Sequence, residues 1–286
     1  MKLRRHTKVL WSCTAAFAIL LVGAAVQPTI AQSTSKAAAA DAERQQQMVD
    51  GPQRSADNRA RDRYRNPGPV LAFFEVAPQS RVVEILPGSA GYWTEILAPL
   101  VKEDGHYRAA IPKPNPDRPE LMKAIAEFKA KLAADPPSFG RVATVDFSAD
   151  GADIVAPGSA DFVLSFRNLH NWMAAGKAEQ VLAAFHRALR SGGMLGIEEH
   201  RGRTDQPQDP AAKTGYVRED YARAMIEAAG FRFVAKCEVN ANPKDTKDYP
   251  AGVWTLPPTY RLEDQDREKY AAIGESDRFV MKFVKP

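Results

Sequence analysis

A turn of small residues follows an apolar run that contains one carboxylate, and this arrangement is typical of a nucleotide-binding turn. The run covers residues 82–86 with Glu84 inside it, and the turn covers residues 87–91. Small residues allow the backbone of such a turn to approach a ligand closely, and the helix that follows offers unpaired N–H groups at its N-terminus. Glu84 is placed to accept hydrogen bonds from a ribose or from a charged ligand tail. Leu86 and Ala90 stand where many such turns carry glycine.

A second group of residues able to do chemistry is the charged run at 198–201. His200 is a candidate general base, because imidazole titrates near neutral pH, and Glu199 is a candidate for holding its tautomer. Tyr216 and Arg218 are candidates for binding the substrate. The alternative interpretation is a hydrogen-bonded loop of charged side chains. No pair of His, Cys or carboxylate residues has convincing metal-ligand spacing, so we expect no metal.

Alternating strand and helix patterns bring these two groups to one edge of a sheet. Strands are expected at 81–86, 106–111, 141–146, 161–166, 194–199, 231–239 and 278–284, and helices at 92–101, 118–133, 176–190 and 218–229. Such alternation predicts a doubly wound α/β domain, in which a mostly parallel sheet carries helices on both faces. Ligands bind such sheets beyond the carboxyl ends of the strands, where the strand order reverses. If the first and fourth strands are neighbours, we expect residues 88–92 and 166–172 to converge there and Asp146 to lie close to the same rim.

The first 31 residues have the pattern of a secretory signal peptide. Their basic head contains Lys2, Arg4, Arg5 and Lys8. An apolar run at 9–26 follows, and small residues at 29–31 predict cleavage near Ala31. An uncleaved membrane anchor is the alternative, because the run is close to spanning length. The head and the small-residue exit favour cleavage, so we expect a periplasmic or secreted protein without stable membrane insertion.

Removal of the signal peptide changes the charge of the chain. The four basic residues of the signal account for the whole net charge of +4. Nucleic acid therefore loses its electrostatic support as a partner, and a small-molecule substrate is expected instead. Cys13 lies within the signal and Cys237 is then alone, so no intrachain disulfide is possible.

The mature chain is expected to consist of a flexible leader at 32–54 and one α/β domain at 55–286. The leader is rich in Ala, Gln, Ser and charged residues and has few large apolar ones. Within the domain, residues 240–276 form a long irregular insertion before the last strand. Its prolines and aromatics allow two interpretations, a lid over a binding site or a segment that covers the sheet edge.

Several motifs together resemble those of one protein family. They lie at 84–88, 94–99, 161–163, 189–195, 199–201, 214–219, 252–258 and 273–278. On these residues the chain resembles the class I S-adenosylmethionine-dependent methyltransferases. Within that superfamily it is most similar to the predicted methyltransferases found behind signal peptides in proteobacteria. The resemblance extends from about residue 55 to the C-terminus.

This resemblance implies a Rossmann-like sheet of seven strands with the last strand antiparallel, and S-adenosyl-L-methionine as cofactor. It further implies the cofactor-binding residues, which are Glu84, Gly88, Ala90, Gly91, Asp146, Asn168 and His170. Asp146 would lie near the adenine, and Asn168 and His170 near the reacting methyl group. The reaction would be in-line methyl transfer to an unknown acceptor, which requires mainly alignment from the protein. The chain departs from the family at 109–113, where no acid follows the second strand to bind the ribose.

A second function class is a non-catalytic exported protein that keeps the methyltransferase fold to bind a ligand. The cofactor is made in the cytoplasm, and a chain exported unfolded arrives without it. The missing acid after the second strand favours the same interpretation, since a fold does not determine a function. Hydrolysis at Ser89 or Ser165 is excluded, because neither serine lies in a Gly-x-Ser-x-Gly turn.

Overall fold

The computed structural model describes residues 27–286, which form two units, one ending at Ala40 and the other comprising Asp41–Pro286. The expected signal peptide lies outside the described residues except for 27–31, which begin helix α1 (Gln27–Asp50). Among the described residues, no helix combines the length and the apolar character needed to span a bilayer. The candidate site lies wholly in the second unit.

The second unit is built on a sheet of seven strands in the order β3-β2-β1-β4-β5-β7-β6. The strands are β1 (Arg81–Ile85), β2 (His106–Pro112), β3 (Ala143–Phe147), β4 (Ala160–Phe166), β5 (Leu189–His200), β6 (Arg232–Cys237) and β7 (Arg278–Val284). β1 to β5 pair in parallel, whereas β7 is antiparallel to both β5 and β6. The predicted fold class is confirmed, including the antiparallel last strand.

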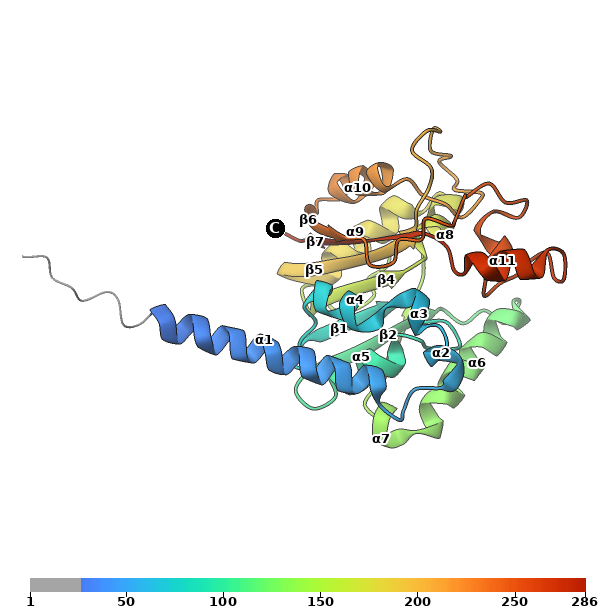
Figure 1. The fold of residues 1–286 in the computed structure, drawn as a ribbon. Helices are drawn as coiled ribbons and strands as arrows, with labels where there is room; N and C mark the ends of the chain where they lie inside the picture. Colours follow the sequence, from blue (N-terminus) through green and yellow to red (C-terminus); the bar gives the residue numbers. More distant parts are fainter. Residues whose placement is uncertain (1–26) are drawn as a thin grey trace, which may run out of the picture. The chain divides into compact units, whose positions relative to one another are not determined.

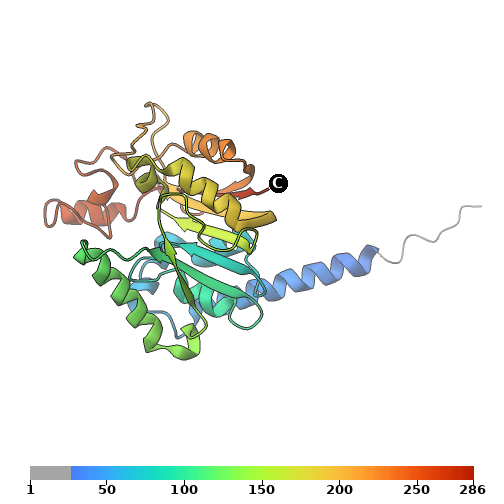
Figure 2. The same cartoon turned by 180° about the vertical axis from the view of Figure 1, so that it is seen from behind.

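Helices cover both faces of the sheet (Figures 1 and 2). One face packs on α4 (Pro67–Phe74), α5 (Thr94–Leu100), α6 (Pro119–Ala134) and α7 (Pro136–Phe139). The other face packs on α8 (Leu169–Ala174), α9 (Ala178–Ala188) and α10 (Glu219–Ala228). α9 buries Val181, Leu182 and Phe185, the spacing of a helix with one apolar face. Because both faces are covered, the central strands are apolar on both sides, as the sequence of β4 shows.

The expectation of a flexible leader is not met for residues 41–54. This segment continues α1 to Asp50 and is part of the second unit. Gln45 donates a hydrogen bond to the carbonyl oxygen of Val76 at 2.8 Å, and Val49 is buried. Ala, Gln, Glu and Arg are strong helix formers, so a composition that lacks large apolar residues still folds when a few side chains find a partner.

Four short elements complete the site region. The helices α2 (Ala56–Arg59) and α3 (Asp62–Arg65) precede α4. The insertion at 240–276 is largely irregular, and it contains the 3-10 turn η1 (Gly252–Thr255) and the helix α11 (Arg267–Ile273). Residues 253–259 of this insertion contribute to a cavity wall, which favours the interpretation as a segment over a binding site.

Candidate active site

A cavity of about 310 Å³ lies at the carboxyl ends of β1, β4 and β5. The strand order reverses between β1 and β4, which is the position where open α/β sheets bind ligands. Its walls come from four parts of the chain: the β1–α5 loop, the β4–α8 loop, the 253–259 segment and the arginines of the N-terminal helices. A larger groove, of about 840 Å³, lies between α9 and α10, but Ala and Met side chains dominate its lining.

The β1–α5 loop reaches the cavity through Gly88. Gly88 has a φ of +71°, and a Cβ at this position would meet nothing within 4 Å, so its backbone faces open space. Gly91 also has a positive φ, but a Cβ there would lie 3.2 Å from Phe128, so this glycine serves close packing. The carbonyl oxygen of Ala90 accepts a hydrogen bond from Asn58 at 2.9 Å. Of the three small residues predicted to bind the cofactor, the structure places only Gly88 in the cavity wall.

Glu84 is buried beneath the loop and does not line the cavity. Its carboxyl group accepts hydrogen bonds from the hydroxyl groups of Tyr107 and of Thr94, the latter at 3.1 Å. Burial raises the pKa of Glu84 to about 7, although both hydrogen bonds oppose the shift. Asp146 lies on the exposed edge strand β3, also away from the cavity. The structure therefore separates these two predicted cofactor residues from the cavity.

The loop after β4 carries the two other predicted cofactor residues, and both line the cavity. Asn168 donates a hydrogen bond to the carbonyl oxygen of Ile85 at 3.2 Å, which joins the ends of β1 and β4. His170 follows in the first turn of α8. Between β4 and Asn168, Arg167 adopts a φ of +62°, and its main-chain N–H donates to Glu198 at 2.7 Å.

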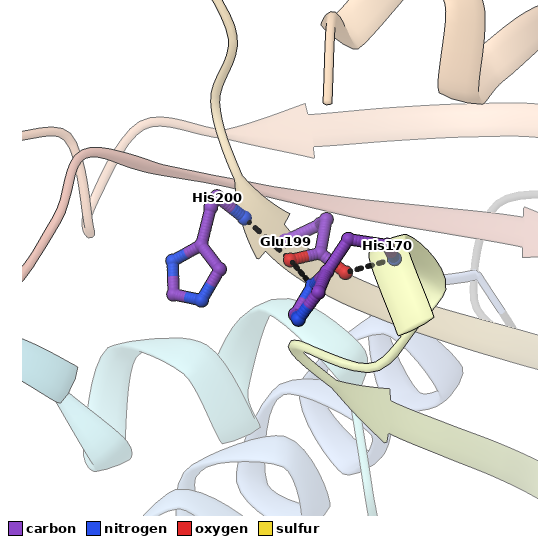
Figure 3. Close-up of side chains that lie close together, drawn as sticks. All are labelled: His170, Glu199 and His200. Carbon is purple, nitrogen blue, oxygen red and sulfur yellow. Dashed lines mark hydrogen bonds and ion pairs between the residues drawn. The ribbon is translucent and has the colours of Figure 1, made fainter. Parts of the chain in front are cut away.

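Glu199 fixes His170, as Figure 3 shows. The Nδ1 of His170 lies 2.9 Å from Oε1 of Glu199, and the main-chain N–H of His170 donates to Oε2 at 3.2 Å. An ionised carboxylate only accepts hydrogen bonds, so Nδ1 carries the proton and Nε2 keeps its lone pair. Because His170 lines the cavity, this arrangement is that of a general base held by a buried carboxylate.

The predicted pairing of Glu199 with the ring of His200 is therefore wrong. Glu199 contacts His200 only through the main-chain N–H of His200, at 2.8 Å, whereas Nδ1 of His200 lies 2.6 Å from Oγ of Ser276. Successive residues of a strand point to opposite faces, so Glu199 faces α8 while its neighbours turn away. Burial lowers the pKa of His200 well below its ordinary value, and the positive charge of Arg167 lowers it further. His200 lines the cavity as a neutral imidazole.

His170, Glu199 and His200 offer ligand atoms within 4.8 Å of one another, the one such group in the described part of the chain. The sequence did not predict this proximity, because His170 belongs to the start of α8 whereas Glu199 and His200 belong to the end of β5. Both oxygens of Glu199 already accept N–H donors. Arg167 adds positive charge beside His200. A divalent cation would have to displace those donors against this charge, so the group suits proton transfer better.

Tyr216, the third predicted catalytic residue, is a structural anchor in this geometry. Its hydroxyl donates to Oδ1 of Asp245 at 2.9 Å, and both side chains are buried. The Tyr216 ring lies 6.4 Å from that of His200 but does not line the cavity. Arg218 pairs with the exposed Asp220 at 2.9 Å. The contact of Tyr216 with Asp245 ties the 240–260 segment to the domain.

The sequence did not predict the side chains that give the cavity its positive charge and its aromatic wall. Arg61, Arg65 and Arg167 line it, as does Trp254, whose ring lies 5.9 Å from that of His170. Arg61 and Arg65 are four residues apart and so share one side of a helical turn, which is the signal that was available. The convergence of these residues with Arg167 depends on tertiary structure.

Solved structures with a similar fold include three relevant cases. An S-adenosylmethionine-dependent methyltransferase from Aquifex aeolicus gives a TM-score of 0.52 at 16% identity, over 79% of this chain and 93% of that one. The [4+2]-cyclase SpnF gives 0.53 at 15% identity, over 81% of each chain. Phosphoethanolamine N-methyltransferase 2 from Haemonchus contortus, in complex with S-adenosylmethionine, gives 0.50 at 14% identity, over 76% of this chain and 51% of that one.

The chain has the class I methyltransferase fold. No protein-family model matches its sequence, and no curated protein matches it either. At identities of 14–16%, the likeness concerns the fold alone. The presence of a cyclase among structures of this fold shows that the reaction has to be argued from the residues of the cavity.

Proposed function

We propose that the protein is an S-adenosylmethionine-dependent methyltransferase that acts on a small molecule. One observation carries the proposal: the turn after β1 and the loop after β4 meet in a cavity that exposes Gly88, Asn168 and His170 together. This is the ligand position of a doubly wound sheet, and here it contains a backbone opening and a positioned base.

The cavity fits the cofactor on its β1 and β4 sides. Gly88 admits close approach of a ligand to the main chain, because no atom lies within 4 Å of the position of a Cβ. Phe166 and Trp254 supply aromatic surface to the cavity wall, and such surface favours a sulfonium cation. When bound, the cofactor supplies a methyl group activated by that positive charge.

The chain's own residues then have defined tasks. Nε2 of His170 takes the proton that the acceptor gives up, while Glu199 holds the imidazole in the required tautomer. The 253–259 segment, with Trp254, forms one wall of the cavity and shields bound reactants from water on that side. Alignment of the acceptor with the methyl group provides most of the acceleration in a displacement of this kind.

Calorimetry with the chain lacking residues 1–31 tests the proposal. We expect binding of S-adenosylhomocysteine to the unchanged protein and at least a tenfold loss in Gly88→Gln, whose side chain enters the cavity. Gly158→Gln is the matched control, because Gly158 has nearly the same φ of +70°, also faces open space and lies outside the cavity. Absence of binding to the unchanged protein refutes the proposal, as does equal loss in both variants.

A second candidate function is a periplasmic or secreted binding protein that retains the fold without catalysis. The observation that favours it is the end of β2, where Pro112 and the exposed Lys113 stand in place of an acid that would hold a ribose. Membership of the exported family of proteobacterial proteins would fit this location. Mass spectrometry of small molecules released from protein isolated from the periplasm distinguishes the two functions. Recovery of an adenosyl compound favours the methyltransferase, and recovery of another ligand alone favours the binding protein.

A further inference from the structure

Four arginines and two glutamates form a cluster at the floor of the cavity. Arg278 lies 3.2 Å from both Glu198 and Glu275, and both of these carboxylates are buried. The remaining contacts of the cluster are Arg61 to Glu275 at 2.6 Å, Arg65 to Glu275 at 3.5 Å and Arg167 to Glu198 at 3.7 Å. Four positive charges thus face two negative ones.

The arginines of the cluster change the pKa values of their neighbours. Burial would raise the pKa of Glu275, but Arg278, Arg65 and Arg167 lower it to about 2. Burial lowers the pKa of Arg65, and the neighbouring charge of Arg167 lowers it further. Glu275 is therefore ionised at neutral pH. By formal charge, the four guanidinium groups of the cluster outnumber its two carboxylates by two.

Several donors of the cluster have no hydrogen-bond partner among the residues that the structure describes. They are Nη2 of Arg61, Nη2 of Arg65 and Nε of Arg278. Nε of Arg65 and Nε of Arg167 also lack a hydrogen bond, although each lies beside a carboxylate, at 3.5 Å from Glu275 and 3.7 Å from Glu198. The side chain of Arg65 is only 2% exposed, yet it lines the cavity. Buried donors without partners are costly, and guanidinium groups bind carboxylate and phosphate oxygens in a fork geometry. The excess positive charge and the donors without partners both favour the binding of an anion in the cavity.

We propose that the Arg61–Arg65–Arg167 wall binds an anionic group, a carboxylate or phosphate, of the methyl acceptor. This inference rests on the proposed function and names the substrate class. The cofactor cannot supply the missing charge, because its sulfonium and ammonium groups outweigh its single carboxylate and leave it net positive. An anionic acceptor neutralises the cluster, is attracted to the sulfonium, and is held beside Nε2 of His170.

Inorganic phosphate is the probe, measured by calorimetry at constant ionic strength with and without saturating S-adenosylhomocysteine. We expect phosphate to bind both forms, and Arg61→Gln to weaken phosphate binding about tenfold while the affinity for S-adenosylhomocysteine changes less than twofold. Arg61 is suited to substitution because its side chain is 22% exposed, and Arg167→Gln is the second variant should Arg61→Gln fail to fold. Arg187→Gln, which removes a surface arginine paired with Asp153, is the control.

The outcomes separate the two possible sources of the anion. Competition between phosphate and S-adenosylhomocysteine, together with weaker cofactor binding in Arg61→Gln, would assign the cluster to the cofactor's own carboxylate and overturn the proposal. Phosphate binding that is absent, or unaffected by both variants, overturns it as well. If phosphate binds as expected but S-adenosylhomocysteine does not bind at all, the anion site stands as such. The methyltransferase function then fails, and with it the assignment of the anion to a methyl acceptor.

Discussion

Replacement of Glu84 by glutamine tests whether this residue belongs to the fold or to a cofactor site. In the folded protein the pKa of Glu84 is raised from 4.5 to about 7, chiefly by burial. The folded state therefore binds more protons than the unfolded state between these two pH values. Stability from the protonated carboxyl is fully present below pH 4.5 and is lost as the pH rises through 7.

The size of this effect follows from the shift. At 1.36 kcal/mol for each pKa unit, the free energy of unfolding falls by about 3 kcal/mol between pH 4.5 and pH 8 because of Glu84 alone. Glutamine has nearly the same shape and stays neutral, so Glu84→Gln lacks this loss. The stability of the variant relative to the unchanged protein should thus rise by about 3 kcal/mol over the same pH range.

Urea unfolding of both proteins at pH 4.5, 6 and 8 measures the difference. Asp161→Asn is a suitable control, because Arg81 holds the pKa of Asp161 below its ordinary value and its effect on stability changes little over this range. We expect Glu84→Gln to change the affinity for S-adenosylhomocysteine less than threefold. A stability difference that does not depend on pH, combined with a large loss of cofactor affinity, would refute the reasoning and make Glu84 a cofactor ligand.

Three further predictions concern the surroundings of the cavity. The pKa of His200 is lowered, so this residue by itself should lower stability as the pH drops below about 6.5, opposite to the contribution of Glu84. The stability of His200→Asn relative to the unchanged protein should therefore be higher at pH 5 than at pH 8, as measured by urea unfolding at both pH values. Tyr216→Phe should cost about 2 kcal/mol by removing the bond to Asp245, and hydrogen exchange should rise in the 240–260 segment; the exposed Tyr221→Phe should change neither. Because Glu199 is saturated with N–H donors, treatment with a chelator should leave S-adenosylhomocysteine affinity unchanged, and stoichiometric metal in the purified protein would contradict this.

Much of the sheet was predictable because strand formation leaves a local signal. The expected bounds of β1, β2, β4 and β7 differ from the observed ones by at most one residue at either end. β5 begins at Leu189 rather than at 194, since the glycines at 192 and 193 read locally as a helix cap. The main-chain N–H of Gly192 instead donates to Lys285, almost a hundred residues away. Such a partner cannot be read from a local pattern.

The sheet topology made the position of the candidate site predictable, but it did not predict which side chains point into the cavity. The carboxyl ends of β1 and β4 had to meet, and the structure does bring Gly88, Asn168, His170 and His200 to one cavity. The direction of side chains at those ends depends on packing. Glu84 is covered by Tyr107, which belongs to the neighbouring strand. The position of Glu84 in the sequence indicates the fold. Its burial depends on residues that are distant in the sequence, such as Tyr107.

Two features of the cavity, the His170–Glu199 pair and the arginine cluster, bear on its function in different ways. A base held by a carboxylate, as in His170 with Glu199, serves a reaction in which the acceptor loses a proton. A binding protein needs no such pair, but it needs the donors of the arginine cluster as much as an enzyme does. Loss of phosphate binding in Arg61→Gln therefore does not separate the two functions, whereas His170→Gln does. In an enzyme His170→Gln should leave both phosphate and S-adenosylhomocysteine bound with little change and reduce methyl transfer about a hundredfold. In a binding protein no transfer exists to be lost, so the pair of measurements decides which function the fold supports here.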